Sequence, residues 1–198
     1  MPIAINGSGT VTGISVGGLP DGIVDTDMIA AAAVTAPKRG PGAILQVKHA
    51  IKQNGFSVSA STGNFSDITD VSVSITVADS NNKVLIHFQS SFSTGGDVNQ
   101  RGSFRLLRGS TVVNAASADG QSTNQTIFPS IAVQQTSQCM PVAGTYFDDP
   151  GAGTHIYKLQ VGAESSAGTV LVNAVGSGST GTTHYKGVTN LVCMEVAV

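Results

Sequence analysis

The feature that most constrains this chain is a strict two-residue alternation of apolar and small polar residues at Val71–Val77, VSVSITV. Successive side chains of a β-strand point to opposite faces of a sheet, so this period predicts a strand with one buried and one exposed face. Further predicted strands are Ile44–Ile51, Lys83–Phe92, Ser103–Leu107, Thr111–Ala115, Ile127–Gln134, His155–Val161, Thr169–Val175 and Thr189–Val198. Turn sequences such as DSNN, RGS and DDPGAG separate them. The sequence therefore predicts an all-β head over residues 44–198, an antiparallel β-sandwich or jelly roll.

Residues 1–43 have a different character. They are rich in glycine and contain no Lys, Arg or His before Lys38. The NGSG sequence after Ile5 predicts a hairpin turn. A short helix is expected over Asp27–Val34, capped by Asp25 or Thr26 and stopped by the Ala36–Pro37 pair. This is the only helix that the sequence predicts.

The branched aliphatic residues that precede the predicted helix are few, and glycines lie between most of them. They are Ile3, Ile5, Val11, Ile14, Val16, Leu19, Ile23 and Val24. Burying so few side chains does not offset the conformational entropy lost when nearly forty residues become ordered. We therefore expect residues 1–43 to form an extended attachment arm that orders against a partner through these eight side chains.

Composition excludes several classes of partner. Charged residues make up 11% of the chain, and ten Lys and Arg face twelve Asp and Glu, so no basic surface for nucleic acid is expected. No apolar run approaches the roughly 20 residues that a membrane helix needs. The start, MPIAINGSGT, lacks the basic and apolar regions of a signal peptide, which predicts assembly in a cytoplasm.

The short motifs of catalytic and metal sites give no convincing match. No HExxH sequence occurs. The glycine-rich GTVTGISVGG contains GISVG, which fits GxSxG, but no convincing strand–helix unit surrounds it, and it lacks the lysine of a phosphate-binding loop. The four histidines, His49, His87, His155 and His184, are interpreted as structural or polar-face residues. We expect no enzyme activity, no catalytic residue, no cofactor and no bound metal.

Two acidic pairs allow a second interpretation. Asp148 and Asp149 precede Pro-Gly, and Asp67 and Asp70 lie in FSDITD. Paired carboxylates can bind a cation or serve a glycosidase, but a solvated turn is the favoured interpretation for both pairs.

The basic and aromatic residues also have structural interpretations. Arg101 and Arg105 share one face of a predicted strand and Arg108 takes the other, which favours a solvated face or subunit salt bridges over anion binding. The phenylalanines Phe56, Phe65, Phe88, Phe92 and Phe104 are assigned to the core. Cys139 and Cys193 are expected to be free and mostly buried, although the sequence leaves a disulfide open.

Three stretches resemble virion proteins of tailed bacteriophages, particularly cyanophages. Asn6–Val47 resembles a short N-terminal module with the pattern GTITG-x-x-VGGLPDG, followed by an Ala-rich helix, that precedes many phage tail and capsid accessory domains. The end, GVTNLVCMEVAV, resembles the final strand of small trimeric jelly-roll knobs, and VSVSITVADSNNKVLIHFQSSF resembles strands of the same domain. The chain departs from that pattern at ITVADS, where such domains often carry Pro, and at Cys193.

This resemblance implies a homotrimeric virion protein. The leading expectation is a capsid cement or decoration protein whose arm binds the major capsid protein. The alternative is a receptor-binding tail fibre tip that recognises host glycans through Phe147–Gly153 or Gly176–Thr183. A polysaccharide depolymerase using Asp148 is the third and least favoured interpretation.

Overall fold

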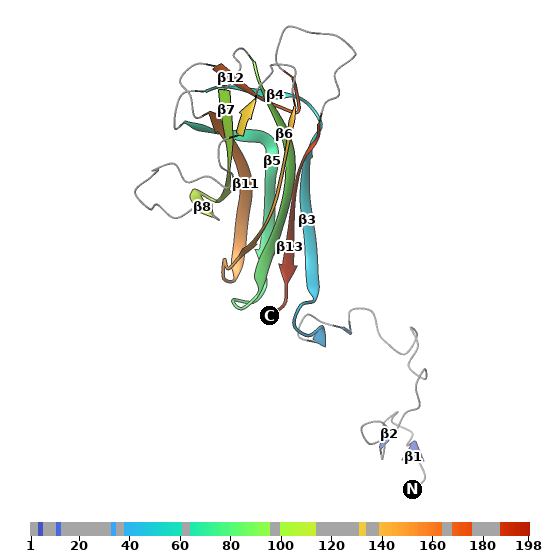
Figure 1. The fold of residues 1–198 in the computed structure, drawn as a ribbon. Coiled ribbons are helices and arrows are strands. Elements are labelled where there is room, and N and C mark those ends of the chain that lie inside the picture. The colour runs from blue at the N-terminus through green and yellow to red at the C-terminus, as the bar shows by residue number, and fades with distance from the viewer. Residues whose placement is uncertain are drawn as a thin grey trace. The chain divides into compact units, whose positions relative to one another are not determined.

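The computed structural model describes residues 4–5, 11–12, 33–34, 38–60, 64–95, 100–113, 131–133, 139–163, 168–175 and 187–198. The chain divides into two compact units, Met1–Arg39 and Gly40–Val198. Every described regular element is a β-strand except for a single 3-10 turn residue at Lys38 (Figure 1). In those same residues, no helix is long and apolar enough to cross a membrane.

The described part of the first unit contains one pair of short strands. β1 (Ala4–Ile5) and β2 (Val11–Thr12) pair antiparallel, with Ala4 opposite Thr12 and Ile5 opposite Val11. This pairing confirms the hairpin predicted around NGSG. The helix predicted over Asp27–Val34 lies outside the described residues, apart from Ala33 and Val34, which are not helical.

The second unit, called the head below, contains two antiparallel sheets (Figure 1). The four long strands of the first sheet run in the order β3 (Ile44–Lys52), β13 (Thr189–Val196), β6 (Lys83–Thr94) and β10 (Met140–Asp148). Short β12 (Gly168–Val172) pairs with the end of β6, and β4 (Phe56–Ala60) pairs with β12. The second sheet runs in the order β5 (Phe65–Val77), β11 (Gly153–Ala163), β7 (Gln100–Arg108) and β8 (Thr111–Val113), and β9 (Ile131–Val133) also pairs with β7.

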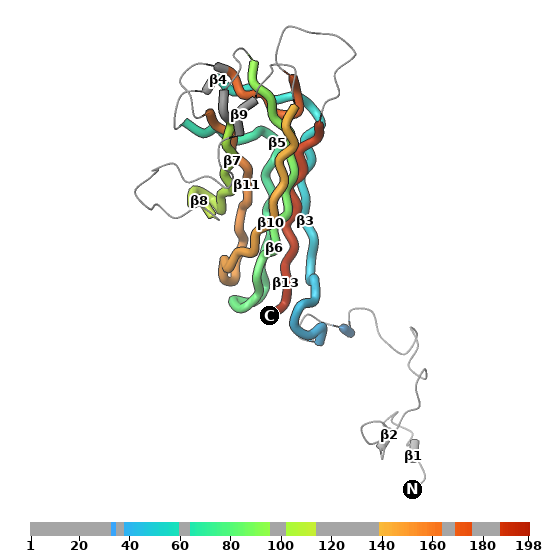
Figure 2. Tube along the Cα trace, in the orientation of Figure 1, coloured from blue at the N-terminus to red at the C-terminus, as the bar shows by residue number. Residues whose placement is uncertain are grey.

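The connections make this sandwich a jelly roll. From β5 onward, successive long strands alternate between the sheets: β5, β7 and β11 lie in the second sheet, and β6, β10 and β13 lie in the first. The first and last strands of the head, β3 and β13, pair with each other along their length (Figure 2). Such alternation with antiparallel neighbours is the double Greek key of a jelly roll, as the sequence predicted.

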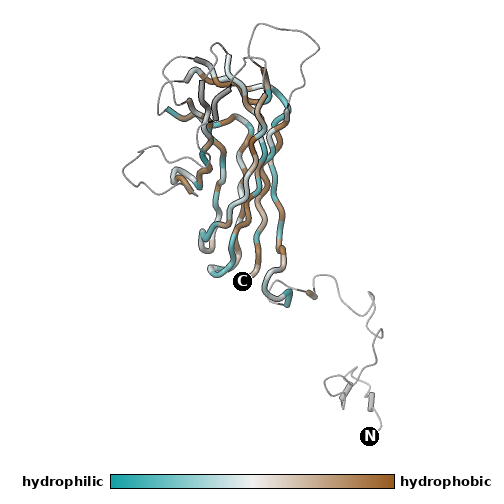
Figure 3. Tube along the Cα trace, in the orientation of Figure 1, coloured by the Kyte–Doolittle hydropathy of each residue, from teal (hydrophilic) through white to brown (hydrophobic). Residues whose placement is uncertain are grey.

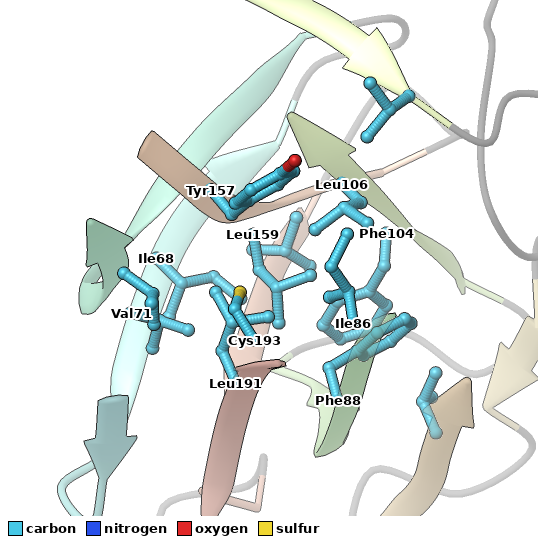
Figure 4. Packing of buried hydrophobic residues seen from close by; sticks show 14 of the residues in the cluster. Ile68, Val71, Ile86, Phe88, Phe104, Leu106, Tyr157, Leu159, Leu191 and Cys193 are labelled. Atoms are coloured by element: carbon cyan, nitrogen blue, oxygen red, sulfur yellow. The ribbon is translucent and has the colours of Figure 1, made fainter. Parts of the chain in front are cut away.

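Alternation along the strands creates the core between the sheets. The apolar positions of VSVSITV are all buried, while its serines and Thr76 are exposed. Figure 3 shows the same change between hydrophobic and hydrophilic residues along the long strands. Inward side chains of both sheets meet in one cluster that includes Phe88, Leu159 and Leu191 (Figure 4). Phe92 and Phe104 pack edge to face, with ring centroids 5.7 Å apart.

The predictions locate most strands of the head but miss short β4 and long β10. β10 contains Pro141 and Gly144, which weaken a strand signal. Among the described strands β10 pairs only with β6, so it is an edge strand there and tolerates proline. Of the predicted strand Ile127–Gln134, the structure describes β9 alone.

The phenylalanine assignment needs one correction. Phe88, Phe92 and Phe104 are buried and Phe56 packs against the core, as predicted. Phe65, by contrast, is half-buried outside the core cluster, with the Arg105 guanidinium 3.6 Å from its ring centroid. Its position at the start of β5 places it on the outer side of the second sheet, where a cation covers it.

Candidate interaction face

Most of the eight arm residues predicted to contact a partner lie outside the residues that the structure describes. Ile5 and Val11 lie opposite each other in the β1–β2 pair. Ile3, Ile14, Val16, Leu19, Ile23 and Val24 lie outside the described residues. Their partner-binding role stays a prediction.

The acidic pair at the end of β10 is divided between the interior and the surface. Asp148 is 5% exposed, accepts a 2.6 Å hydrogen bond from the Tyr157 hydroxyl and pairs with Arg108 at 2.7 Å. Burial and the Asp148 carboxylate both raise the pKa of Tyr157, because each disfavours the phenolate. The side chain of Asp149 is 66% exposed and pairs with Lys83. The solvated-turn interpretation is therefore correct for Asp149 and wrong for Asp148, which links β10 of the first sheet to β7 and β11 of the second.

A second buried carboxylate joins the sheets at the end of β13. Glu195 is 1% exposed and accepts hydrogen bonds from Gln46 (2.6 Å), the Ala78 backbone N–H (2.9 Å) and the Asn82 amide (2.7 Å). Burial alone would raise the pKa of Glu195, but these three donors favour the carboxylate and lower the pKa below its ordinary value. Sequence reasoning did not single out Glu195, because a lone Glu in an apolar strand gives no signal of its partners.

A third polar contact closes the edge beside β3. Lys52 donates to Thr69 at 3.0 Å and to Asp70 at 3.2 Å, and Asp70 has a positive φ of 66° at a break in the β5–β11 register. These residues border a shallow hollow of about 420 Å³ lined by Ile51, Lys52, Gln53, Asn54 and Asp70. The Lys52 ammonium is already held by Thr69 and Asp70, so the contact serves to join the sheet edges.

The remaining candidates have ordinary structural partners. Asp67 accepts hydrogen bonds from Lys158 and Gln160, both at 2.7 Å. It is half-exposed, as the solvated-turn interpretation predicted, but it lies in strand β5 and not in a turn. Arg105 and Arg108 take opposite faces of β7, as predicted, while the side chain of Arg101 is outside the described set. Among the described residues, no three His, Cys, Asp or Glu side chains gather into a metal-binding group.

The cysteines and histidines complete the predicted set. Cys139 and Cys193 are both free, as predicted, with Cys139 half-buried and Cys193 fully buried. Burial raises the pKa of the Cys193 thiol to about 12. His49 and His87 are exposed on the first sheet, and a ring nitrogen of His155 lies 3.1 Å from the Gly151 carbonyl oxygen. His184 lies outside the described residues.

The outer face of the first sheet is the most distinctive surface of the described head. In the strand register Phe147 lies opposite Leu85, Leu85 opposite Met194, and Met194 opposite Val47. These four side chains form an apolar row across β10, β6, β13 and β3, which we call the apolar row. Phe147 and Val47, at its two ends, are 50% and 53% exposed. Sequence reasoning missed this row because its members lie far apart in the chain, from Val47 to Met194.

Two further rows extend this surface without adding a formal charge. The register gives the row Thr145, His87, Val192 and His49, followed by the row Ala143, Gln89, Asn190 and Ile51. Together with the apolar row they make twelve positions that contain no Asp, Glu, Lys or Arg, and we call these twelve residues the uncharged face. A surface with apolar residues and depleted charge has the composition of the centre of a protein–protein interface.

Comparison with known proteins leaves the family of this chain open. No protein-family model matches it, and no curated protein matches its sequence. A chain in the structure of infectious bursal disease virus Gx strain is 14% identical with a TM-score of 0.37, and the match covers 77% of this chain and 37% of that one. The CBM22-1 xylan-binding domain of Paenibacillus barcinonensis Xyn10C is 9% identical with a TM-score of 0.32, covering 80% of this chain and 97% of the domain.

A phage protein is also among the similar structures. The enzymatically active domain of tailspike protein 4 of bacteriophage CBA120 is 13% identical with a TM-score of 0.25, covering 66% of this chain and 19% of that one. At these scores none of the likenesses carries an argument about function. The jelly-roll assignment rests on the strand order and register of the chain itself.

Proposed function

We propose that this chain is a structural protein of a virion, specifically a capsid cement or decoration protein that acts as a homotrimer. In this proposal the N-terminal arm binds the major capsid protein and the jelly-roll head forms the protruding part. The proposal combines the phage-like sequence of Asn6–Val47 with the organisation of the head.

The observation that carries the proposal is that the first and last strands of the head pair with each other. These strands are β3 and β13, and the Gly42 N–H donates to the Ala197 carbonyl oxygen at 2.8 Å just beyond them. The described core cluster of the head begins with Ala50 and Phe56, and all its other members follow Phe56 in the sequence. The described core of the head is therefore built by residues from Ala50 onward, and the proposal assigns attachment to the arm.

Trimeric association would make such attachment effective. Three arms on one assembly raise the effective concentration of each arm at the capsid surface after the first arm has bound. Each single arm–capsid contact can then be weak, as expected for a segment that orders only on binding.

Particles with and without the protein test the cement role. We expect copies in proportion to the capsomers of the shell, and particles lacking the protein should release their genome at lower temperature or under milder osmotic shock. Particles that withstand heat and osmotic shock equally well without the protein would refute the cement role.

A receptor-binding fibre tip is the second candidate. The observation in its favour is the half-exposed Phe147 beside the exposed Asp149, since an aromatic ring next to a carboxylate can contact a sugar. In that case copies per particle should be few, and antibody against the head should block adsorption to the host. For a decoration protein the same antibody should leave adsorption unchanged.

A further inference from the structure

The exposed apolar residues of the first sheet are organised rather than scattered. Single exposed apolar side chains are ordinary on protein surfaces. Here exposed Phe147 and Val47 are joined by the half-buried Leu85 and Met194 into consecutive neighbours across four strands. Strands are about 4.8 Å apart and alternate residues on one face are about 6.8 Å apart, so the uncharged face spans roughly 400 Å² as a flat area. Seven of its twelve residues are apolar, and contiguous apolar patches of a few hundred Å² often serve an interaction.

The position of the apolar row also exposes it at both edges of the sheet. β3 pairs only with β13, and β10 pairs only with β6, so both are edge strands of the described sheet. Val47 ends the row on β3 and Phe147 ends it on β10. One copy of the head can therefore present apolar surface to a neighbour on each side, which is what a closed ring of copies requires.

Charge favours a second copy of this chain as the occupant. The twelve positions of the uncharged face carry no formal charge, and the Lys83–Asp149 ion pair that borders the apolar row has no net charge, so identical faces can approach each other without net like-charge repulsion. It also offers no charge pattern by which a different, charged partner would be selected. The opposite sheet differs, because its outer face carries Lys158, Asp67 and Arg105.

We propose that copies of this chain associate through the outer face of the first sheet, with the apolar row at the centre of the interface. This inference rests on the proposed function in so far as it supplies the interface for the proposed homotrimer. The apolar row provides the dry centre. The row containing His87 and His49 borders it on one side and the Lys83–Asp149 ion pair on the other, and these form the polar rim.

Sedimentation equilibrium of the full chain tests this inference with a matched set of single substitutions. Val47→Glu and Phe147→Glu place a carboxylate at either end of the apolar row. Ile156→Glu is the control, because Ile156 is 49% exposed on the outer face of the second sheet. All three positions are half-exposed, so circular dichroism and thermal melting should show that each variant keeps the fold.

We expect the wild type to sediment at a multiple of the 20.0 kDa chain mass, namely three times that mass if the proposed trimer is correct. Val47→Glu and Phe147→Glu should weaken association by about 30-fold or more, as for central interface residues, while Ile156→Glu should associate like the wild type. A wild type that stays monomeric at its highest soluble concentration would overturn the inference. So would an assembly that survives both row substitutions.

The outcome is separable from that of the proposed function. An assembly that depends on the apolar row but does not bind capsids supports this inference and refutes the cement role. Capsid binding by a protein that is monomeric in solution refutes this inference and leaves the cement role standing.

Discussion

The two sheets of the head share one core but differ on their outer faces. On the second sheet the outward residues are mainly Ser, Thr and ion-paired side chains, such as Thr76 hydrogen-bonded to Thr154 at 2.9 Å and Lys158 paired with Asp67. On the first sheet the twelve outward residues of the uncharged face are apolar or neutral polar, and the Lys83–Asp149 ion pair lies only at their border. Both faces satisfy the two-residue alternation of a strand. The difference shows that alternation decides which side chains point outward, while their chemistry decides whether that side meets water or protein.

We expect the largest difference in stability between substitutions on the inner side and on the outer side of the first sheet. Phe88, on β6, is fully buried, whereas Phe147, on β10, is half-exposed. Phe88→Ala should lower the free energy of unfolding by about 3–5 kcal/mol, because it leaves a cavity in the core. Phe147→Ala should change it by about 0.5 kcal/mol or less when the protein is diluted to the monomer.

Urea denaturation of both variants measures this difference. If Phe147→Ala proved as destabilising as Phe88→Ala in the monomer, Phe147 would be a core residue and the outer face would need to be redrawn.

A smaller effect should distinguish the adjacent carboxylates at the end of β10. Asp148→Ala removes the acceptor for the buried Tyr157 hydroxyl and the partner of Arg108, so we expect a loss of about 1–3 kcal/mol. Asp149→Ala removes only an exposed ion pair, which contributes about 1 kcal/mol at most. Thermal melting of the two variants checks this order, and equal losses would show that Asp148 does not join the sheets.

The smallest expected effect is the contribution of Glu195 to the change of stability with pH. Its pKa is lowered in the folded chain, so the carboxylate stabilises the fold above the pKa of the unfolded state. That contribution is lost as the pH falls through the folded-state pKa, because protonation removes an acceptor for Gln46, Ala78 and Asn82. Denaturation of wild type and Glu195→Gln between pH 7 and pH 3 should show a shallower acid decline for the variant. Parallel declines would assign the acid sensitivity to other groups.

The sequence predicted the parts of this molecule that depend on local pattern. The alternation at Val71–Val77 located β5 and its buried face, and the NGSG turn located the β1–β2 pair. The strand at Met140–Asp148 escaped prediction because Pro141 and Gly144 break the pattern, and an edge position makes that break harmless.

The candidate face depends on register rather than on local pattern. Phe147, Leu85, Met194 and Val47 become neighbours only after four strands far apart in the chain have paired. Burial of Asp148 likewise depends on β10 meeting Arg108 and Tyr157 of the other sheet. Neither property is visible in any short stretch of sequence.

The most direct test of the contrast between the two faces is proximity labelling at matched positions. Thr145 is exposed beside the apolar row and Ser74 is exposed on the second sheet, and both are small hydroxyl residues. In a Cys139→Ser background, Thr145→Cys and Ser74→Cys can each be labelled with pyrene, because burial raises the pKa of the Cys193 thiol to about 12 and makes it unreactive. We predict concentration-dependent excimer fluorescence from the label at position 145 and monomer emission from the label at position 74. Excimer emission from position 74 alone, or from neither position, would contradict the assignment of the first sheet as the contact face.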